Sequence, residues 1–131
     1  LQNERRYSSF RAYAQSKLAN IYFTYELART LAGSGVTANC LHPGFVATNF
    51  GQSNGGFSAL LFRMVQIAAI TPERGALSSL YLAASPEVEG VSGKYYVDRK
   101  AVNSSPVSYD EQAARRLWQV SLEMAGVPAA F

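Results

Sequence analysis

The feature that most restricts how this chain can fold is a long stretch with apolar residues at helical spacing, followed directly by a short apolar segment. From about residue 8, where a serine can cap a helix, apolar side chains recur every three or four residues as far as residue 31. Gly33 ends this period, and residues 36–41 are typical of a short buried strand. The turn signal His42-Pro43-Gly44 follows at once. A long helix, a glycine-marked turn and a strand make up half of a βαβ unit, so the sequence predicts an α/β fold.

Tyr13 and Lys17 stand one helical turn apart near the start of this predicted helix. Side chains four residues apart share one face of a helix, so the ammonium is expected beside the phenol. A positive charge in that place favours a phenolate over a neutral phenol. The pair is therefore a candidate acid–base group for chemistry near neutral pH. The alternative interpretation is an ordinary surface tyrosine beside a solvated lysine.

The rest of the chain predicts three more helices and one more strand. Residues 57–70 are apolar nearly all round, which favours burial on several sides, a ligand or a partner. Thr71-Pro72-Glu73 is a strong helix start, because a capping hydroxyl, a proline at the first helical position and an acid follow one another. The sequence at 108–111 is a capping box and predicts the start of the last helix. In order, these elements are helix 57–70, helix 71–85, strand 93–98, loop 98–107 and helix 108–124.

Composition excludes several classes of protein. A chain of 131 residues, 48% apolar and 16% charged, fits one globular domain. The net charge of +3 comes from scattered basic residues, so nucleic-acid binding is not expected. Cys40 is the single cysteine, lies in an apolar run and is interpreted as an inert buried thiol of a cytoplasmic protein. With one histidine and one cysteine no metal site is expected, and no apolar stretch is long enough to span a bilayer, so membrane contact is not expected.

Two segments resemble the short-chain dehydrogenase/reductase family, and within it the branch of retinol dehydrogenases and their bacterial relatives. The first segment is Ala12-Tyr13-Ala14-Gln15-Ser16-Lys17-Leu18-Ala19-Asn20. The second runs from Gly35 through His42-Pro43-Gly44 to Thr48. The resemblance extends over about residues 5–126. A Tyr-x-x-x-Lys motif followed by Pro-Gly after the next strand is far more specific than either motif alone.

The resemblance implies an enzyme in which Tyr13 passes a proton to or from the substrate oxygen while a hydride moves to or from the nicotinamide ring. Lys17 would favour the ionised form of Tyr13 and hydrogen-bond the nicotinamide ribose. Such an enzyme interconverts an alcohol and a carbonyl compound with NADP or NAD, and the resemblance favours NADP. The apolar segment 57–70 falls where family members carry a mobile substrate lid, which suggests an apolar carbonyl compound or alcohol as substrate.

The resemblance also implies cofactor contacts in the second segment. Pro43 and Gly44 would let the backbone pass close to the nicotinamide ring. The backbone of Val46 and the hydroxyl of Thr48 would hold the carboxamide, although Thr48 could instead simply cap a turn. His42, directly before the turn, is interpreted as a structural residue rather than an acid–base group.

Three features of the family pattern are missing from this sequence. No glycine-rich turn precedes a helix to hold a pyrophosphate, and the family's catalytic serine would fall before residue 1. The family's earlier asparagine, which helps relay protons, is also missing. Residues 1–131 are therefore expected to form a single partial Rossmann-type domain without the N-terminal dinucleotide-binding half. The expected fold is the C-terminal part of a doubly wound parallel sheet, with two strands and about four helices.

This partial sheet leaves two functional hypotheses open. In the first, the complete protein is an NAD(P)-dependent oxidoreductase, and the isolated chain is expected to be inactive. In the second, the chain is a non-catalytic remnant of that fold. A central strand would have an uncovered edge in either case, so the chain is expected to form a homo-oligomer or to associate with another polypeptide.

Overall fold

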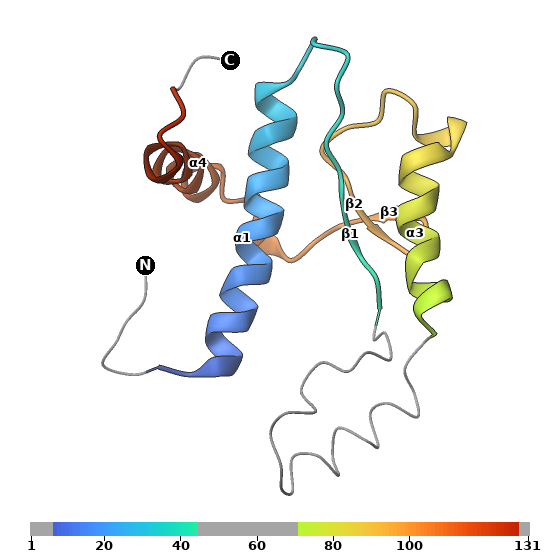
Figure 1. Cartoon of the computed structure of the whole chain (residues 1–131), viewed down its shortest axis with the longest axis horizontal. Coiled ribbons are helices and arrows are strands. Elements are labelled where there is room, and N and C mark those ends of the chain that lie inside the picture. Colours follow the sequence, from blue (N-terminus) through green and yellow to red (C-terminus); the bar gives the residue numbers. More distant parts are fainter. Residues whose placement is uncertain (1–6, 45–70, 129–131) are drawn as a thin grey trace, which may run out of the picture. The chain divides into compact units, whose positions relative to one another are not determined.

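Residues 7–44 and 71–128, which the computed structural model describes, form helices and short strands (Figure 1). In chain order they are α1 (Ser9–Thr30), β1 (Cys40–His42), α3 (Pro72–Ala84), β2 (Tyr95–Val97), β3 (Lys100–Val102) and α4 (Glu111–Ala125), with short 3₁₀ helices at Pro86–Val88 and Pro106–Tyr109. The chain divides into a first unit of Leu1–Cys40, Gly90–Tyr95 and Asn103–Phe131 and a second unit of Leu41–Glu89 and Tyr96–Val102. The predicted α/β class is confirmed, and these elements are consistent with part of a Rossmann-type fold.

α1 follows the local signals of its sequence. The side chain of Ser8 accepts a hydrogen bond from the N–H of Arg11 and so caps the first turn. The helix continues to Thr30, and Gly33 follows with a φ of +82°, a left-handed conformation that glycine adopts without strain. The helix predicted at 8–31 is therefore confirmed.

A row of buried hydroxyls ties α1 to the segment that precedes α4. Tyr25, the one buried residue of α1, places its hydroxyl 2.7 Å from Ser104 Oγ, which lies 2.5 Å from Ser108 Oγ. Ser108 donates its single hydroxyl proton to the carbonyl of Ser105 at 2.6 Å. The remaining bonds must therefore run from Tyr25 to Ser104 and from Ser104 to Ser108. Each buried hydroxyl of the row has a partner, as burial of a polar group requires.

Two tyrosines of α1 extend this attachment. The ring of Tyr25 stacks on the ring of Tyr109, with 5.6 Å between the centroids. The hydroxyl of Tyr22 donates to the carbonyl of Val107 at 2.8 Å. The 3₁₀ helix Pro106–Tyr109 is thus attached to α1 by hydrogen bonds and by ring contact together.

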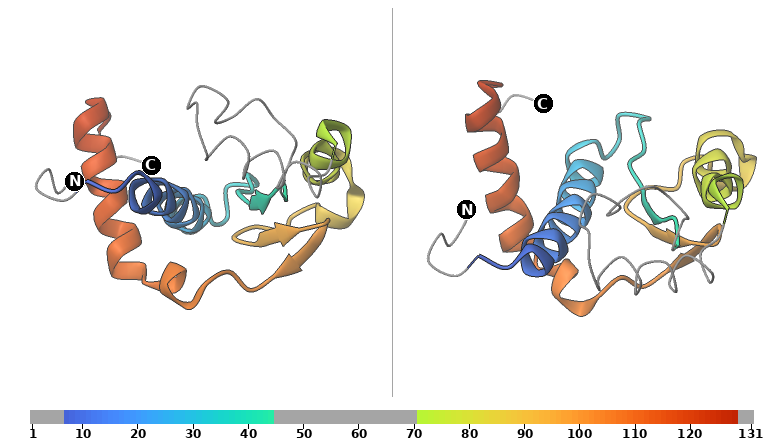
Figure 2. Two further views of the ribbon diagram at one scale, coloured as in Figure 1. Left: turned by 90° about the horizontal axis from the view of Figure 1, so that it is seen from below. Right: turned by 60° about the horizontal axis from the view of Figure 1, so that its bottom comes forward.

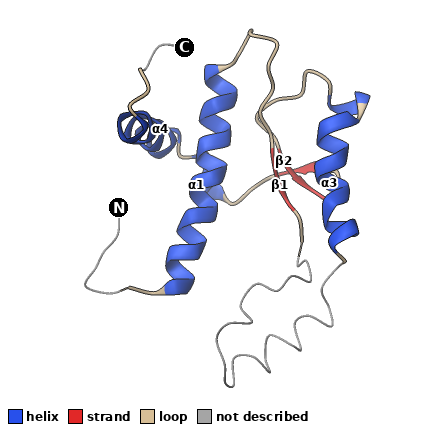
Figure 3. Ribbon diagram, viewed as in Figure 1, coloured by secondary structure: helices blue, strands red, loops and turns tan. Residues whose placement is uncertain are grey.

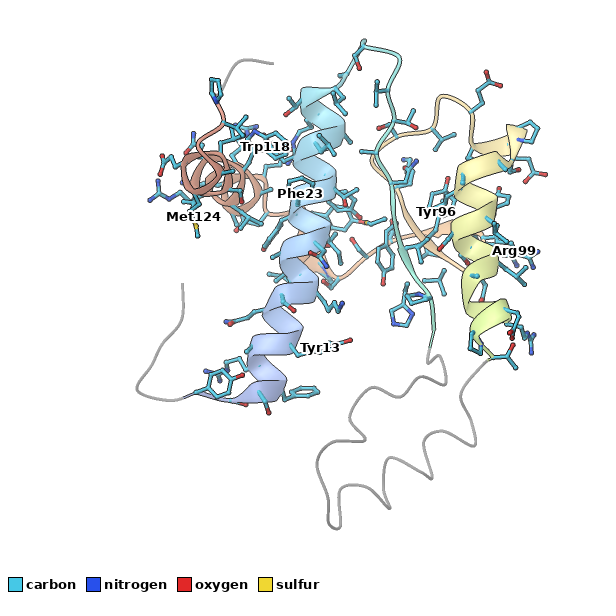
Figure 4. All side chains as sticks on the ribbon, in the orientation of Figure 1. Tyr13, Phe23, Tyr96, Arg99, Trp118 and Met124 are labelled. Carbon is cyan, nitrogen blue, oxygen red and sulfur yellow. The ribbon has the colours of Figure 1, made fainter. Side chains whose placement is uncertain are left out.

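α4 crosses α1 within the first unit (Figure 2). The rings of Phe23 and Trp118 meet between the two helices, with 5.2 Å between their centroids (Figure 4). Asp110 caps α4 by accepting a hydrogen bond from the N–H of Ala113 at 3.0 Å. The predicted start at Ser108 is wrong, because the hydroxyl of that residue belongs to the buried row and not to the helix cap.

Three described strands form one sheet in the order β1-β2-β3, where the sequence predicted two (Figure 3). The two residues Asp98 and Arg99 join β2 to β3, and their φ angles are +48° and +64°. Two positive φ angles in a two-residue connection are typical of a type I′ hairpin, so β3 runs antiparallel to β2. The prediction of a loop at 98–107 is therefore wrong over Lys100–Val102.

Both predicted strands are shorter in the structure. The amide of Asn39 donates to the carbonyl of Val91 at 2.6 Å and accepts from the N–H of Lys94 at 2.9 Å. A side chain thus makes the bonds that a strand ladder would make there, and β1 begins later than the predicted residue 36. Gly93 has a φ of +70°, which lies outside the extended region, so β2 begins after it.

α3 packs on β2 in the second unit. Thr71 caps the helix by accepting a hydrogen bond from the N–H of Arg74, and Pro72 is the first helical residue, as the sequence predicts. The ring of Tyr81 lies 6.3 Å from the ring of Tyr96, which is only 4% exposed and forms the centre of this small core.

The helix predicted at 57–70 lies outside the described residues. The described α-helices are therefore three of the four that were predicted. None of these three combines the length and the apolar character needed to cross a lipid bilayer.

The Tyr25→Phe substitution tests the buried row, because it removes the first hydroxyl and keeps the ring. Ser104 then loses a buried partner, so we expect the free energy of unfolding to fall by about 1–2 kcal/mol. Tyr22→Phe is the matched control: its bond to Val107 is exposed, and the expected loss is about 0.5 kcal/mol. Urea unfolding followed by circular dichroism measures both, and equal losses would contradict the importance given to burial.

Alkaline pH tests the same residue independently. Burial raises the pKa of Tyr25 to about 12 from an ordinary value of 10.0. As the pH rises through this window, the unfolded chain loses the phenolic proton before the folded chain does, so the stabilisation present below about pH 10 is lost by about pH 12. We expect the stability difference between wild type and Tyr25→Phe to shrink over this range in denaturant unfolding. A constant difference would show that Tyr25 is not buried as described.

Candidate active site

Tyr13 and Lys17 belong to the N-terminal half of α1. Figure 4 shows Tyr13 near the start of this helix. Lys17 Nζ lies over the ring of Tyr13, 5.3 Å from the ring centroid, which is within the range of a cation–π interaction. The four-residue spacing on the helix brings the two groups together. Both side chains are exposed, Tyr13 to 51%, so a ligand can reach them from solvent. The hydroxyl of Ser16 donates to the carbonyl of Tyr13 at 2.7 Å and supports the same turn of the helix.

This pair can hold and move a proton. The phenol of Tyr13 can donate its proton to an oxygen or recover it. The ammonium of Lys17 also offers hydrogen-bond donors to a polar ligand. The proximity expected from the spacing is present, and the catalytic roles stay predictions.

The turn at His42-Pro43-Gly44 follows β1 in the second unit. Gly44 has a φ of +81°, and its N–H donates to Nδ1 of His42 at 2.9 Å. Pro43 contributes no N–H to the turn. Pro43 and Gly44 are exposed, and a glycine without a Cβ lets a flat group come close to the backbone.

The structure describes four of the six predicted site residues. The acid–base pair belongs to the first unit, and the Pro-Gly turn belongs to the second. Val46, Thr48 and the predicted lid at 57–70 lie outside the described residues. That all of these groups form one site stays a prediction.

Cys40 lies in an environment that makes its thiol less reactive. The side chain is half-buried and donates to the carbonyl of Lys94 at 3.8 Å. Burial raises the pKa of the Cys40 thiol, which is the opposite of what a nucleophilic cysteine requires. Within residues 7–44 and 71–128, no three His, Cys, Asp or Glu side chains gather closely enough to hold a metal ion.

The bond from Gly44 to His42 was not predicted from the sequence. The sequence signal for this bond is the two-residue spacing between His42 and Gly44. In an Asx turn, a side chain, normally of Asn or Asp, accepts a hydrogen bond from the N–H two residues further on. In His42 an imidazole nitrogen occupies the place of the amide or carboxylate oxygen.

Comparison with known proteins gives one family and several close relatives. A sequence model of the family described as Enoyl-(Acyl carrier protein) reductase matches residues 1–99. Retinol dehydrogenase 14 of Mus musculus is 48% identical over 130 residues, which cover 97% of this chain and 39% of that protein. Retinol dehydrogenase 12 of Homo sapiens is 42% identical over 127 residues, 97% of this chain and 40% of that protein. Polyprenol dehydrogenase of Homo sapiens is 42% identical over 130 residues, 97% of this chain and 39% of that protein. The chain thus spans about two-fifths of the length of these curated relatives.

Replacing Gly44 by alanine tests the conformation of the turn. An L side chain in the left-handed region costs about 1–2 kcal/mol, so we expect Gly44→Ala to lower the free energy of unfolding by that amount. Gly33→Ala is a matched control, because its φ of +82° is nearly the same and a Cβ there meets nothing within 4 Å. Urea denaturation should give similar losses for both variants. A Gly44→Ala variant as stable as wild type would mean that the turn does not have this conformation.

Proposed function

Because the chain belongs to the short-chain dehydrogenase/reductase family, we propose that the protein of which it forms part interconverts an alcohol and a carbonyl compound with a nicotinamide cofactor. The observation that carries this proposal is the Tyr13–Lys17 pair, a phenol and an ammonium on one exposed helix face. The turn at Pro43-Gly44 follows the pair in the order that the family pattern requires.

In this proposal Tyr13 is the acid–base group. During reduction of a carbonyl compound its phenol donates a proton to the oxygen, and during oxidation of the alcohol the phenolate takes that proton back. Lys17 holds the developing negative charge on the phenol oxygen and donates hydrogen bonds to ribose hydroxyls. The bound nicotinamide supplies or accepts the hydride.

The residues present fit a nicotinamide cofactor. Gly44 has no Cβ and a left-handed backbone, so a flat ring can approach the turn. By family resemblance Val46 and Thr48 would bind the carboxamide, and NADP is favoured over NAD. A cytoplasmic location remains part of this proposal on the basis of the single cysteine.

We propose an apolar alcohol, or the corresponding carbonyl compound, as the substrate class. The sequence support is the apolar segment 57–70, and the support from relatives is in the names retinol dehydrogenase and polyprenol dehydrogenase. Both names refer to alcohols that are largely hydrocarbon, and an apolar wall is what such a substrate requires.

The domain and its association are also proposed. Residues 1–131 would form one partial Rossmann-type domain that needs further polypeptide to complete its sheet. β1 ends the order of the described strands, so one of its edges is unpaired within the described part of the chain. Phe10 and Met124 are exposed to 81% and 78%, which favours association with another copy or another polypeptide. The same observations support the second candidate function, a self-associating module without catalysis.

Cofactor binding separates the two candidate functions. If the chain binds NADPH or NADH, a concentration one hundred times the dissociation constant should stabilise it by about 2.7 kcal/mol. Thermal unfolding with and without each cofactor measures this stabilisation. Absence of a shift with both cofactors at millimolar concentration would favour the module without catalysis.

In an active protein that contains this chain, Tyr13→Phe tests the catalytic assignment. Loss of the phenolic proton should abolish turnover and leave cofactor affinity unchanged, because the ring and Lys17 remain. Tyr7→Phe, which removes another exposed phenol, is the control and should keep full turnover. Turnover by Tyr13→Phe at the wild-type rate would refute the assigned role.

A further inference from the structure

The imidazole of His42 makes one described hydrogen bond, and that bond fixes its protonation. The N–H of Gly44 donates to His42 Nδ1 at 2.9 Å, so Nδ1 must offer a lone pair. A histidine that accepts at Nδ1 is neutral and carries its proton on Nε2, because the imidazolium form has protons on both nitrogens and accepts none.

This bond closes the turn across Pro43. The N–H of Gly44 is the first backbone donor after the end of β1, since the proline has none. Its acceptor is a side chain two residues earlier, as in an Asx turn. The bond holds the backbone while Gly44 adopts its φ of +81°, a conformation that glycine occupies no more readily than extended ones.

We propose that His42 is a positioning residue for the nicotinamide site: its Nδ1 holds the Pro43–Gly44 backbone in the conformation that receives the ring. This inference rests on the proposed function for the identity of the ligand. It assigns His42 a role in binding through Gly44 and no direct part in proton transfer to the substrate.

Nuclear magnetic resonance of the chain tests the bond without any cofactor. His42 is the single histidine of the sequence, so its side-chain ¹⁵N signals are assigned without ambiguity. For the neutral imidazole we expect the proton on Nε2, and we expect His42→Ala to shift the Gly44 amide signal because the acceptor is lost. A neutral imidazole with the proton on Nδ1, or a Gly44 amide signal that His42→Ala leaves unchanged, would overturn the proposal.

Two substitutions then test the link to the cofactor. His42→Ala removes the acceptor and should weaken cofactor binding by about three- to tenfold, as expected for one lost hydrogen bond. His42→Asn supplies an amide oxygen at the same spacing and should restore the affinity. Lys100→Ala, which shortens an exposed side chain of β3, is the control.

Isothermal titration calorimetry of a protein that contains this chain, with NADPH and NADH, gives these affinities. Equal cofactor binding by wild type, His42→Ala and His42→Asn would overturn the role of His42 and leave the proposed function intact. Binding of neither cofactor by wild type would overturn the proposed function and this proposal with it.

Discussion

The hydrogen bond between Tyr25 and Ser104 holds the first unit together. α1 buries a single residue, so its position depends on what the hydroxyl and the ring of Tyr25 contact. Both contacts lead to the same short segment: the hydroxyl begins the row that ends at the carbonyl of Ser105, and the ring stacks on Tyr109. α4 begins directly after this segment and packs back on α1 through Phe23. A satisfied, directional polar network and the packing of α4 thus hold α1 together.

Elements that follow local signals could be predicted from the sequence. α1 and α3 have capping residues, a stop signal and helical spacing within their own segments, so no distant contact was needed to find them. β3 was missed because its turn, Asp98-Arg99, lacks the glycine that usually marks a type I′ hairpin. All three residues of β3 are exposed, so the strand also lacks the alternation of apolar and polar side chains on which strand prediction depends.

Contacts between distant residues account for the other errors. Ser108 has the spacing of a helix cap, but its hydroxyl bonds Ser104 and Ser105 instead, in a row that begins at Tyr25, far away in sequence. β1 is shorter than predicted for a similar reason, because the side chain of Asn39 bonds a segment that is distant in sequence. Sequence spacing alone does not reveal which of several possible partners a polar side chain takes.

The candidate site also has one feature that could be predicted from the sequence and one that could not. The proximity of Tyr13 and Lys17 follows from helix geometry and was predictable. The hydrogen bond from the Gly44 N–H to the imidazole of His42 was not predictable, although the two residues are only two positions apart. The reason is that this pattern is known mainly from Asn and Asp. The family resemblance supports a proposal that no local rule supplies, namely that the exposed pair on a helix and the turn after β1 serve one ligand. We propose that this joint role defines the active site.

A structure of a protein that contains this chain, bound to NADP⁺ and an unreactive alcohol analogue, tests that claim most directly. We predict that the nicotinamide ring lies against the backbone of Gly44. The Tyr13 hydroxyl should lie within about 2.6–3.2 Å of the alcohol oxygen, as proton transfer requires. A nicotinamide ring bound away from the Pro43-Gly44 turn, or a Tyr13 hydroxyl directed away from the alcohol, would contradict it.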